Sequence, residues 1–219
     1  MTPDLRLYAL VDPAVAGGRS LPELAKLLVG TATLVQLRDK HGTTRAMIDA
    51  ARALKAVLAP AGIPLLINDR VDVALAAQAD GVHIGQDDMD AADARRLLGP
   101  NAIIGLSIKT PAQAAAAPLD ALDYVAIGGV YATTSKDNTA APIGTQGLRA
   151  IAAAIRARKA GYPVCAIAGI TAANAGEVIA AGADGVAVIS ALSLAAEPAA
   201  AARELRAVVD DALKRRGQG

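Results

Sequence analysis

Short apolar runs alternate along the chain with longer segments in which apolar residues recur at helical spacing. Each run is apolar at nearly every position and rich in Val, Ile or Leu, which is typical of strands buried on both faces. We therefore expect eight β-strands. They are Leu5–Val11, Thr33–Leu37, Pro64–Ile67, Gly81–Ile84, Ile103–Leu106, Tyr124–Ile127, Pro163–Ala168 and Gly185–Val188.

The segments between these runs have the pattern of amphipathic helices. In Thr43–Ala59, for example, Ala46, Ala50, Leu54 and Leu58 fall on one helical face. Ala-Gly and Ala-Asp-Gly turns follow several of these segments and are typical of a helix end followed by a new strand. Strands that alternate with helices indicate parallel pairing.

Eight such units favour closure into a (β/α)8 TIM barrel, an α/β fold, over an open sheet. A doubly wound nucleotide-binding sheet would need a G-x-G-x-x-G turn directly after its first strand, and residues 12–18 do not fit that pattern. We see no linker or low-complexity segment that would mark a second domain. We therefore expect a single barrel domain over residues 1–219, a length that suits this fold.

Composition narrows the classes of function. The chain has 22 Lys plus Arg and 21 Asp plus Glu, so its charge does not favour nucleic acid or a membrane surface as a partner. Trp and Phe are absent, which argues against base-stacking platforms. The first residues do not resemble a signal peptide, and we expect a cytoplasmic protein. The one cysteine, Cys165, lies in an apolar run and is expected to be a buried small hydrophobe.

Polar residues gather after the predicted strands, which is where barrel enzymes build their sites. Asp69 follows the third strand and Asp88 the fourth. Both can supply carboxylate oxygens to Mg²⁺, which usually takes one or two carboxylates. Arg38, Lys40 and Lys136 come from the loops after the second and sixth strands and would face the same mouth, where they could contact phosphate. The combination indicates a metal-bound diphosphate.

A second anion site is expected after the seventh and eighth strands. Barrels frequently hold a phosphate there, with the amino ends of helices directed at it. Gly169 would let a phosphate approach the backbone, and Ser190 offers both a hydroxyl and an amide. The polar segment Tyr131–Gln146 is either a lid over the mouth or simply mobile.

Two ring side chains are not assigned to this site. His83 lies inside the fourth strand, and we expect it to be a hydrogen-bonded core residue rather than a catalyst. Tyr8 lies in the first strand, and nothing in the sequence fixes its direction. The inventory therefore contains two anion sites and one metal site, without a convincing nucleophile or general base.

These motifs, in this order, resemble the thiamine-phosphate synthase family. The resemblance covers essentially the whole chain and rests on Val-Gln-Leu-Arg-Asp-Lys at 35–40, Ile-Asn-Asp-Arg at 67–70, Asp-Gly-Val-His-Ile-Gly-Gln-Asp-Asp at 80–88, Gly-Leu-Ser at 105–107, Thr-Thr-Ser-Lys at 133–136, Gly-Ile at 169–170 and Gly-Val-Ala-Val-Ile-Ser at 185–190. The family joins a pyrimidine methyl diphosphate to a thiazole phosphate, which gives thiamine phosphate and pyrophosphate. The resemblance implies this transferase activity, two small-molecule substrates and Mg²⁺ as cofactor.

The resemblance also implies roles for the matching residues. Asp69 and Asp88 would hold Mg²⁺. The pyrimidine diphosphate would be bound by Gln36, Arg38, Lys40, Asn68, Ser107 and Lys136. The thiazole phosphate would be bound by Thr133, Ser135, Gly169, Ile189 and Ser190. In the family's dissociative mechanism, Arg38, Lys40 and Lys136 would act catalytically by stabilising charge on the leaving diphosphate.

The chain also departs from the family pattern. Ala168 stands where the family often has glycine, and Ser135 stands where threonine is usual. Neither change removes a predicted metal ligand or diphosphate contact.

Two other functions stay open. A thiazole tautomerase of the same superfamily would share the barrel and the phosphate site, but it would not need the metal pair and the diphosphate-binding cations together. A non-catalytic barrel could instead bind a phosphorylated ligand and act through a partner. Mg²⁺-dependent turnover would separate the three. The sequence leaves open whether the protein is a homo-oligomer.

Overall fold

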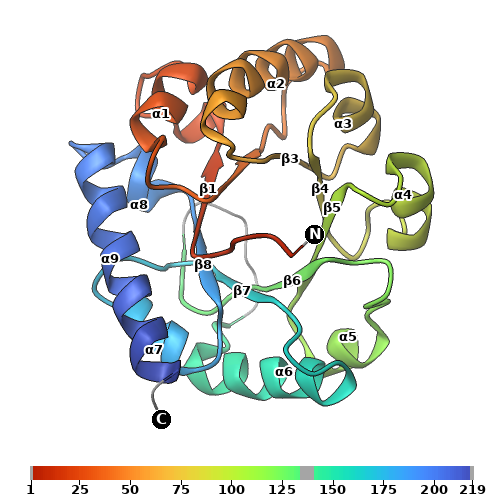
Figure 1. The fold of residues 1–219 in the computed structure, drawn as a ribbon, viewed down its shortest axis with the longest axis vertical. Helices are drawn as coiled ribbons and strands as arrows, with labels where there is room; N and C mark the ends of the chain where they lie inside the picture. Colours follow the sequence, from red (N-terminus) through yellow and green to blue (C-terminus); the bar gives the residue numbers. More distant parts are fainter. Residues whose placement is uncertain (1, 134–140, 218–219) are drawn as a thin grey trace.

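Eight parallel strands form a closed barrel in the computed structural model, which describes residues 2–133 and 141–217. Each strand pairs with the next along the chain, and β8 pairs with β1 to close the ring (Figure 1). The strands are β1 Leu7–Val11, β2 Leu34–Leu37, β3 Leu65–Asn68, β4 Gly81–Ile84, β5 Ile103–Ile108, β6 Tyr124–Ile127, β7 Val164–Ile167 and β8 Gly185–Val188.

Helices surround this ring on the outside (Figure 1). The α-helices are α1 Leu21–Leu28, α2 Thr44–Leu58, α3 Val71–Ala77, α4 Ala91–Leu98, α5 Pro111–Ala116, α6 Gly144–Arg158, α7 Ala175–Ala180, α8 Ser190–Ser193 and α9 Pro198–Gly217. Two short 3-10 helices, η1 Pro13–Val15 and η2 Ala59–Ala61, follow β1 and α2. None of the described helices is long and apolar enough to cross a membrane.

The predicted barrel is confirmed, and β4, β6 and β8 have the predicted bounds. Two strands run further than predicted. β3 includes Asn68 and β5 includes Ser107, because strand pairing continues at both positions. The two polar side chains therefore stand on strands rather than on the loops that follow them.

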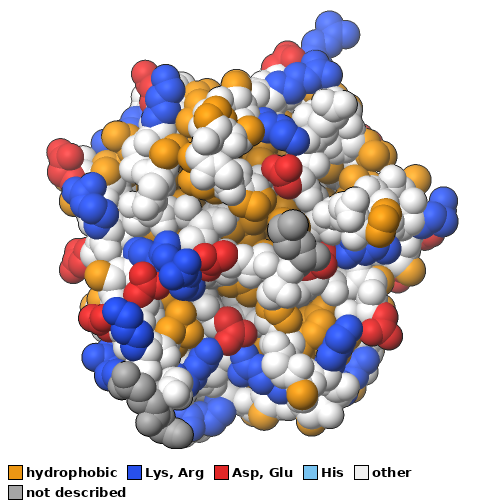
Figure 2. Space-filling view, in the orientation of Figure 1, with side chains coloured by type: hydrophobic (Ala, Val, Ile, Leu, Met, Phe, Trp, Pro, Cys, Tyr) orange, Lys and Arg blue, Asp and Glu red, His pale blue; other side chains and the backbone are white. Residues whose placement is uncertain are grey.

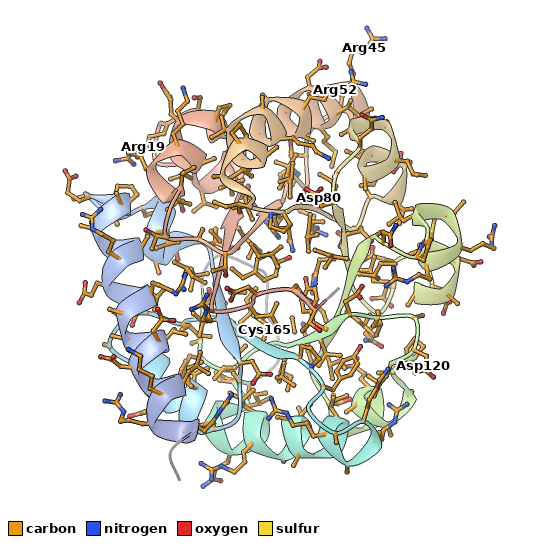
Figure 3. The ribbon with its side chains drawn as sticks, in the orientation of Figure 1. Arg19, Arg45, Arg52, Asp80, Asp120 and Cys165 are labelled. Carbon is orange, nitrogen blue, oxygen red and sulfur yellow. The ribbon has the colours of Figure 1, made fainter. Side chains whose placement is uncertain are left out.

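The core has two parts. The larger lies between the strands and the helices and consists mostly of Leu, Ile, Val and Ala. The smaller fills the lumen of the barrel with side chains from alternate strand positions, among them Tyr8, Leu10, Leu34, Leu66, Ile103, Tyr124, Cys165 and Ala187. Cys165, labelled in Figure 3, is fully buried there as expected, and burial raises the pKa of its thiol.

A repeated hydrogen bond joins the strands in pairs at their amino ends. Residues directly before the even-numbered strands accept from a backbone N–H near the start of the preceding strand: Thr33 from Leu7 at 3.1 Å, Asp80 from Leu65 at 2.8 Å, Asp123 from Ile104 at 2.8 Å and Asp184 from Val164 at 2.9 Å. The three aspartates also form ion pairs with Lys55 of α2, Arg95 of α4 and Arg156 of α6, respectively. These hydrogen bonds thus link the eight strands at their amino ends in four pairs: β1–β2, β3–β4, β5–β6 and β7–β8.

This end of the barrel faces the viewer in the figures. The segment before β1 crosses the centre in front in Figure 1, and Asp80 is labelled in Figure 3. Figure 2 shows the same face, where Lys and Arg side chains lie close to Asp and Glu side chains. The carboxyl ends of the strands, where the candidate site lies, are on the far side.

Candidate active site

At the carboxyl ends of β2 and β3, three predicted residues come together. The Lys40 ammonium forms an ion pair with the Asp69 carboxylate. Asn68 Nδ2 donates to Asp69 Oδ2 at 2.7 Å. Asp69 has a φ of 63°, a left-handed conformation that few residues other than glycine adopt, and its N–H donates to the His83 carbonyl at 2.8 Å. The backbone therefore holds the carboxylate at the barrel mouth.

Asp88, from the loop after β4, faces the same carboxylate. Its Oδ2 accepts from the Gly85 N–H at 2.7 Å. Burial raises the pKa of Asp88, and the neighbouring Asp69 carboxylate raises it further. Within residues 2–133 and 141–217, no group of three or more His, Cys, Asp or Glu side chains could hold a metal. A pair of carboxylates still suits Mg²⁺, which fills its other positions with water and phosphate oxygens.

Arg38 is held by a residue that the sequence did not single out. The Asp12 carboxylate is only 2% exposed and forms an ion pair with Arg38 Nη1. It also accepts from the Ala14 N–H at 2.9 Å and so caps η1. Arg38 Nε is buried without a hydrogen-bond partner in the described part of the chain. The position of Asp12, directly after β1 at the mouth, is the signal that could have revealed it.

Two further predicted residues lie on strands and project into the lumen. Gln36 is buried, and its Nε2 donates to the Tyr8 hydroxyl, whereas its Oε1 is buried without a partner among the described residues. Ser107 Oγ lies 2.9 Å from His83 Nε2. His83 is thus a hydrogen-bonded buried residue, as expected, but its partner belongs to the candidate site. Tyr8 points inward rather than toward the loops.

The predicted phosphate-binding residues lie on the other side of the mouth. Gly169 has a φ of 66°, and a Cβ there would lie 2.5 Å from the Ala132 carbonyl oxygen, so only glycine fits. This close approach, with the Tyr131 N–H donating to the Ala168 carbonyl at 3.1 Å, brings residues 131–132, which precede Thr133, to the end of β7. The β7–β8 register pairs Ile167 with Ala187. Gly169 and Ile189 each lie two residues beyond this pair, just after the two adjacent strands.

Ser190 begins α8 directly after Ile189. The predicted site residues Ser135 and Lys136 lie outside the described residues. The structure thus places Gln36, Arg38, Lys40, Asn68, Asp69, Asp88 and Ser107 on β2–β5 and the loops after them, and Thr133, Gly169, Ile189 and Ser190 at the ends of β6–β8. These assignments as substrate and metal ligands stay predictions.

The fold and the site together define a (β/α)8-barrel protein with a carboxylate pair, basic side chains and a glycine-lined backbone at the carboxyl ends of its strands. Comparison with known proteins gives the particular family. A family model described as thiamine monophosphate synthase matches residues 7–192, and the chain belongs to this family.

Curated relatives that match this chain over nearly their whole length are thiamine-phosphate synthases. The chain is 52% identical to the thiamine-phosphate synthase of Agrobacterium fabrum over 97% of each chain. It is 49% identical to that of Chloroflexus aurantiacus, over 94% of this chain and 93% of the relative. These relatives and the family model confirm the function predicted from the sequence, thiamine-phosphate synthase, and with it a transferase of thiamine biosynthesis.

A solved structure agrees in fold. The thiamine phosphate pyrophosphorylase from Pyrococcus furiosus superposes with a TM-score of 0.83 at 35% identity. The match covers 97% of this chain and 98% of the solved one. The barrel predicted from the apolar runs is therefore also the fold of this relative.

Proposed function

We propose that this synthase joins a pyrimidine methyl diphosphate to a thiazole phosphate with Mg²⁺ held by Asp69 and Asp88. The bond between the methylene carbon and the diphosphate oxygen breaks, and its electron pair leaves with the diphosphate. The thiazole nitrogen then supplies the electron pair for the new carbon–nitrogen bond. The reaction needs no proton transfer by a side chain.

The observation that carries this proposal is the division of the mouth into two halves. The half at β2–β4 has the carboxylate pair with Lys40 beside it, and Arg38 follows β2 in an ion pair with Asp12. The half at β6–β8 has the left-handed Gly169 after β7, packed against the Ala132 carbonyl, and Ser190, which begins α8 after β8. The first half suits a metal-bound diphosphate, and the second suits a phosphate monoester. Two anionic substrates could therefore lie side by side.

The carboxylate pair fits Mg²⁺ on the evidence of its own electrostatics. Burial is the main cause of the raised pKa of Asp88, and the Asp69 carboxylate adds to it; a divalent cation held by both residues would stabilise their ionised forms. When bound, Mg²⁺ would supply positive charge that stabilises the leaving diphosphate.

Arg38 would act as an oriented donor. Its Nη1 is taken by the Asp12 carboxylate, and its buried Nε, unpartnered in the described part of the chain, is suited to donate to a diphosphate oxygen. Lys40 would supply a second positive charge from its present place beside Asp69. Lys136 is expected to add a third, as the sequence motif implies.

Pyrophosphate release tests the proposal. We expect release only when the pyrimidine diphosphate, the thiazole phosphate and Mg²⁺ are all present. Asp69→Asn should lower kcat by about a hundredfold or more, as loss of one preorganised electrostatic group does. Asparagine is the better substitute than alanine because it tolerates the positive φ of Asp69.

Asp72→Asn is the matched control, because Asp72 lies nearby but pairs only locally with Arg70. Wild-type activity in Asp69→Asn would remove the metal hypothesis. Binding of thiazole phosphate without pyrophosphate release would instead favour the tautomerase or the non-catalytic barrel. The cytoplasmic location and the homo-oligomer considered from the sequence stay predictions.

A further inference from the structure

Five polar side chains form a continuous row of hydrogen bonds through the lumen of the barrel. Gln36 Nε2 donates to the Tyr8 hydroxyl, and the Tyr8 and Tyr124 hydroxyl oxygens are 3.0 Å apart. The Tyr124 hydroxyl lies 2.8 Å from His83 Nδ1, and His83 Nε2 lies 2.9 Å from Ser107 Oγ. We call these five residues the lumen relay. It joins two residues, Gln36 and Ser107, that the family resemblance implies as ligands of the pyrimidine diphosphate.

The strand register explains how the relay crosses the barrel. His83 on β4 pairs with Gly105 on β5, and Gly105 pairs with Tyr124 on β6. A side chain at Gly105 would overlap the Tyr124 ring, so this glycine lets His83 and Tyr124 meet. Their rings are stacked with centroids 5.6 Å apart, and the Tyr8 ring stands edge-on to Tyr124 at 5.9 Å. The packing therefore fixes all three rings.

The chemistry of the groups couples the two ends. Burial raises the pKa of both Tyr8 and Tyr124, so each keeps its proton and can donate once. A neutral histidine has one donor nitrogen and one acceptor nitrogen. Buried polar groups that lack a partner are costly, so each group should donate to one neighbour and accept from the other. The direction of donation is then the same along the whole relay.

Among the described partners, only two arrangements meet this condition. The first keeps the Gln36 amide as the structure has it and reverses the contact in which the Tyr124 hydroxyl donates to Tyr8, so that Tyr8 donates to Tyr124. Tyr124 then donates to His83 Nδ1, and His83 Nε2–H donates to Ser107. The Ser107 proton is then directed out of the relay, and Gln36 presents the buried Oε1 that has no partner among the described residues. In the other arrangement, the amide is flipped, every donor reverses, and Ser107 presents only an acceptor.

We propose that the lumen relay sets the hydrogen-bonding character of the two ends together, so that Gln36 offers an acceptor whenever Ser107 offers a donor. An anionic diphosphate oxygen next to Ser107 selects the donor there. The same selection leaves Gln36 Oε1 to accept from the amino group of the pyrimidine. Tyr8, Tyr124 and His83 are positioning residues that make a ring amino group and a diphosphate favour each other's binding. This inference rests on the proposed function.

The tautomer of His83 tests the relay without any substrate. The chain has only two histidines, so ¹⁵N NMR of histidine-labelled protein resolves His83 once His41→Gln identifies the other signal. We expect a neutral ring in the wild type with its proton on Nε2. In Tyr124→Phe, the preference for that tautomer should be lost. A proton on both nitrogens, or a tautomer preference that Tyr124→Phe leaves unchanged, would overturn the proposal.

A double-mutant cycle tests the coupling during turnover. We expect the losses of kcat/KM caused by Gln36→Leu and Ser107→Ala to be non-additive by at least about threefold, within the range known for members of one hydrogen-bond network. In a Tyr124→Phe background, the same two losses should multiply. Additive losses in the wild-type background would refute the relay.

Tyr162→Phe is the matched control for Tyr124→Phe. Tyr162 is also buried, and its hydroxyl donates to the Leu119 carbonyl at 3.2 Å, outside the lumen. It should lose similar thermal stability but keep the non-additivity and the His83 tautomer. If the wild type released no pyrophosphate, the proposed function would fail, while the tautomer would still decide whether the relay is polarised.

Discussion

Backbone strain in this barrel is concentrated where chemistry is expected. Among the described residues other than glycine, three have positive φ: Asp69, Gln78 and Ala168. Gln78 ends α3, where a left-handed residue is common. The other two directly follow β3 and β7, one in each half of the mouth. Strain of this kind persists only where the surrounding structure enforces it, and it is frequent at functional sites.

Ala168 gives a direct test of this strain. Its φ of 92° would suit glycine, the residue that the family often has there. Relief of a left-handed alanine is worth about 1–2 kcal/mol, and the added freedom of the unfolded chain offsets about 0.4–1 kcal/mol of it. We expect Ala168→Gly to raise Tm by roughly 1–4 °C.

The matched control is Ala53→Gly, on the exposed face of α2, which should lose about 1 kcal/mol. Thermal unfolding followed by circular dichroism measures both variants. If Ala168→Gly lost as much as Ala53→Gly, the positive φ at Ala168 would not be a source of strain.

We expect Asp12 to affect catalysis only through its ion pair with Arg38. Asp12→Asn keeps an oxygen to accept from the Ala14 N–H, so Tm should change little. It removes the charge that fixes Arg38 Nη1, and we expect kcat/KM for the pyrimidine diphosphate to fall roughly 10- to 100-fold, as for one hydrogen bond to a charged group. The fall should vanish when Arg38→Ala is already present. An equal fall in that background would show that Asp12 acts on something else.

The contrast between Arg38 and Asp12 shows what sequence could predict at the scale of residues. Arg38 is part of a run with a recognisable order, and a cation after a strand indicates an anion site. Asp12 was indistinguishable from a helix cap, and it is one. Its second role depends on a pairing with a residue 26 positions away, which local pattern does not encode. The same holds for Tyr8 and Tyr124, which meet across 116 positions.

At the scale of elements, the strands were predictable because parallel strands buried on both faces are apolar throughout. The ends of β3 and β5 were not, since Asn68 and Ser107 are polar residues on strands that face the lumen near the mouth. A polar residue there looks like the start of a loop. The hydrogen bonds that link the strand pairs at their amino ends were not predictable from apolar runs either, although an Asp or Thr two residues before a Val recurs at Thr33, Asp80, Asp123 and Asp184.

The four residues that link the strand pairs should contribute more to the free energy of unfolding than ordinary surface charges do. Asp123 accepts from the Ile104 N–H and forms an ion pair with the partly buried Arg95. Its replacement by alanine leaves a backbone donor without its partner, which costs about 1–3 kcal/mol. We expect Asp123→Ala to lower Tm by roughly 3–10 °C.

Asp120→Ala is the control, because the Asp120 side chain is fully exposed where it pairs with Lys159. It should stay within about 0.5 kcal/mol of the wild type. Urea unfolding of both variants measures the difference. Equal effects would mean that Asp123 is an ordinary surface charge and that the strand pairs do not depend on it.

At the scale of the whole molecule, closure of the barrel places the Asp69 and Asp88 carboxylates, which come from two loops, next to each other. This arrangement makes the ionised form of Asp88 less favourable in the folded state. The pKa of Asp88 is raised above its ordinary value of 3.8, chiefly by burial and in part by Asp69. A carboxyl group with a raised pKa in the folded state favours folding while it is protonated. As pH rises from 3.8 through the raised value, that contribution is lost, because the folded protein must then ionise an unfavourably placed group.

Mg²⁺ should reverse this loss, because it binds the ionised pair. We expect saturating Mg²⁺ at roughly 100 times its Kd to add about 2.7 kcal/mol of stability, or roughly 5–10 °C in Tm. The gain should be smaller at about pH 5 than at about pH 8, since protons compete for the same oxygens. Asp88→Asn should raise the Tm of the metal-free protein at about pH 8 and abolish the gain from Mg²⁺.

Asp87→Asn separates a bound metal from a general effect of salt. Asp87 is the neighbour of Asp88, is exposed as Asp88 is, and carries the same charge. It should keep the full gain from Mg²⁺, as well as the pH dependence of the wild type. Differential scanning calorimetry with Mg²⁺ or with K⁺ at matched ionic strength measures these shifts. If Mg²⁺ still raised the Tm of Asp88→Asn, the cation would bind elsewhere. The raised pKa of Asp88 would then reflect only an unfavourable position of its carboxylate in the folded protein.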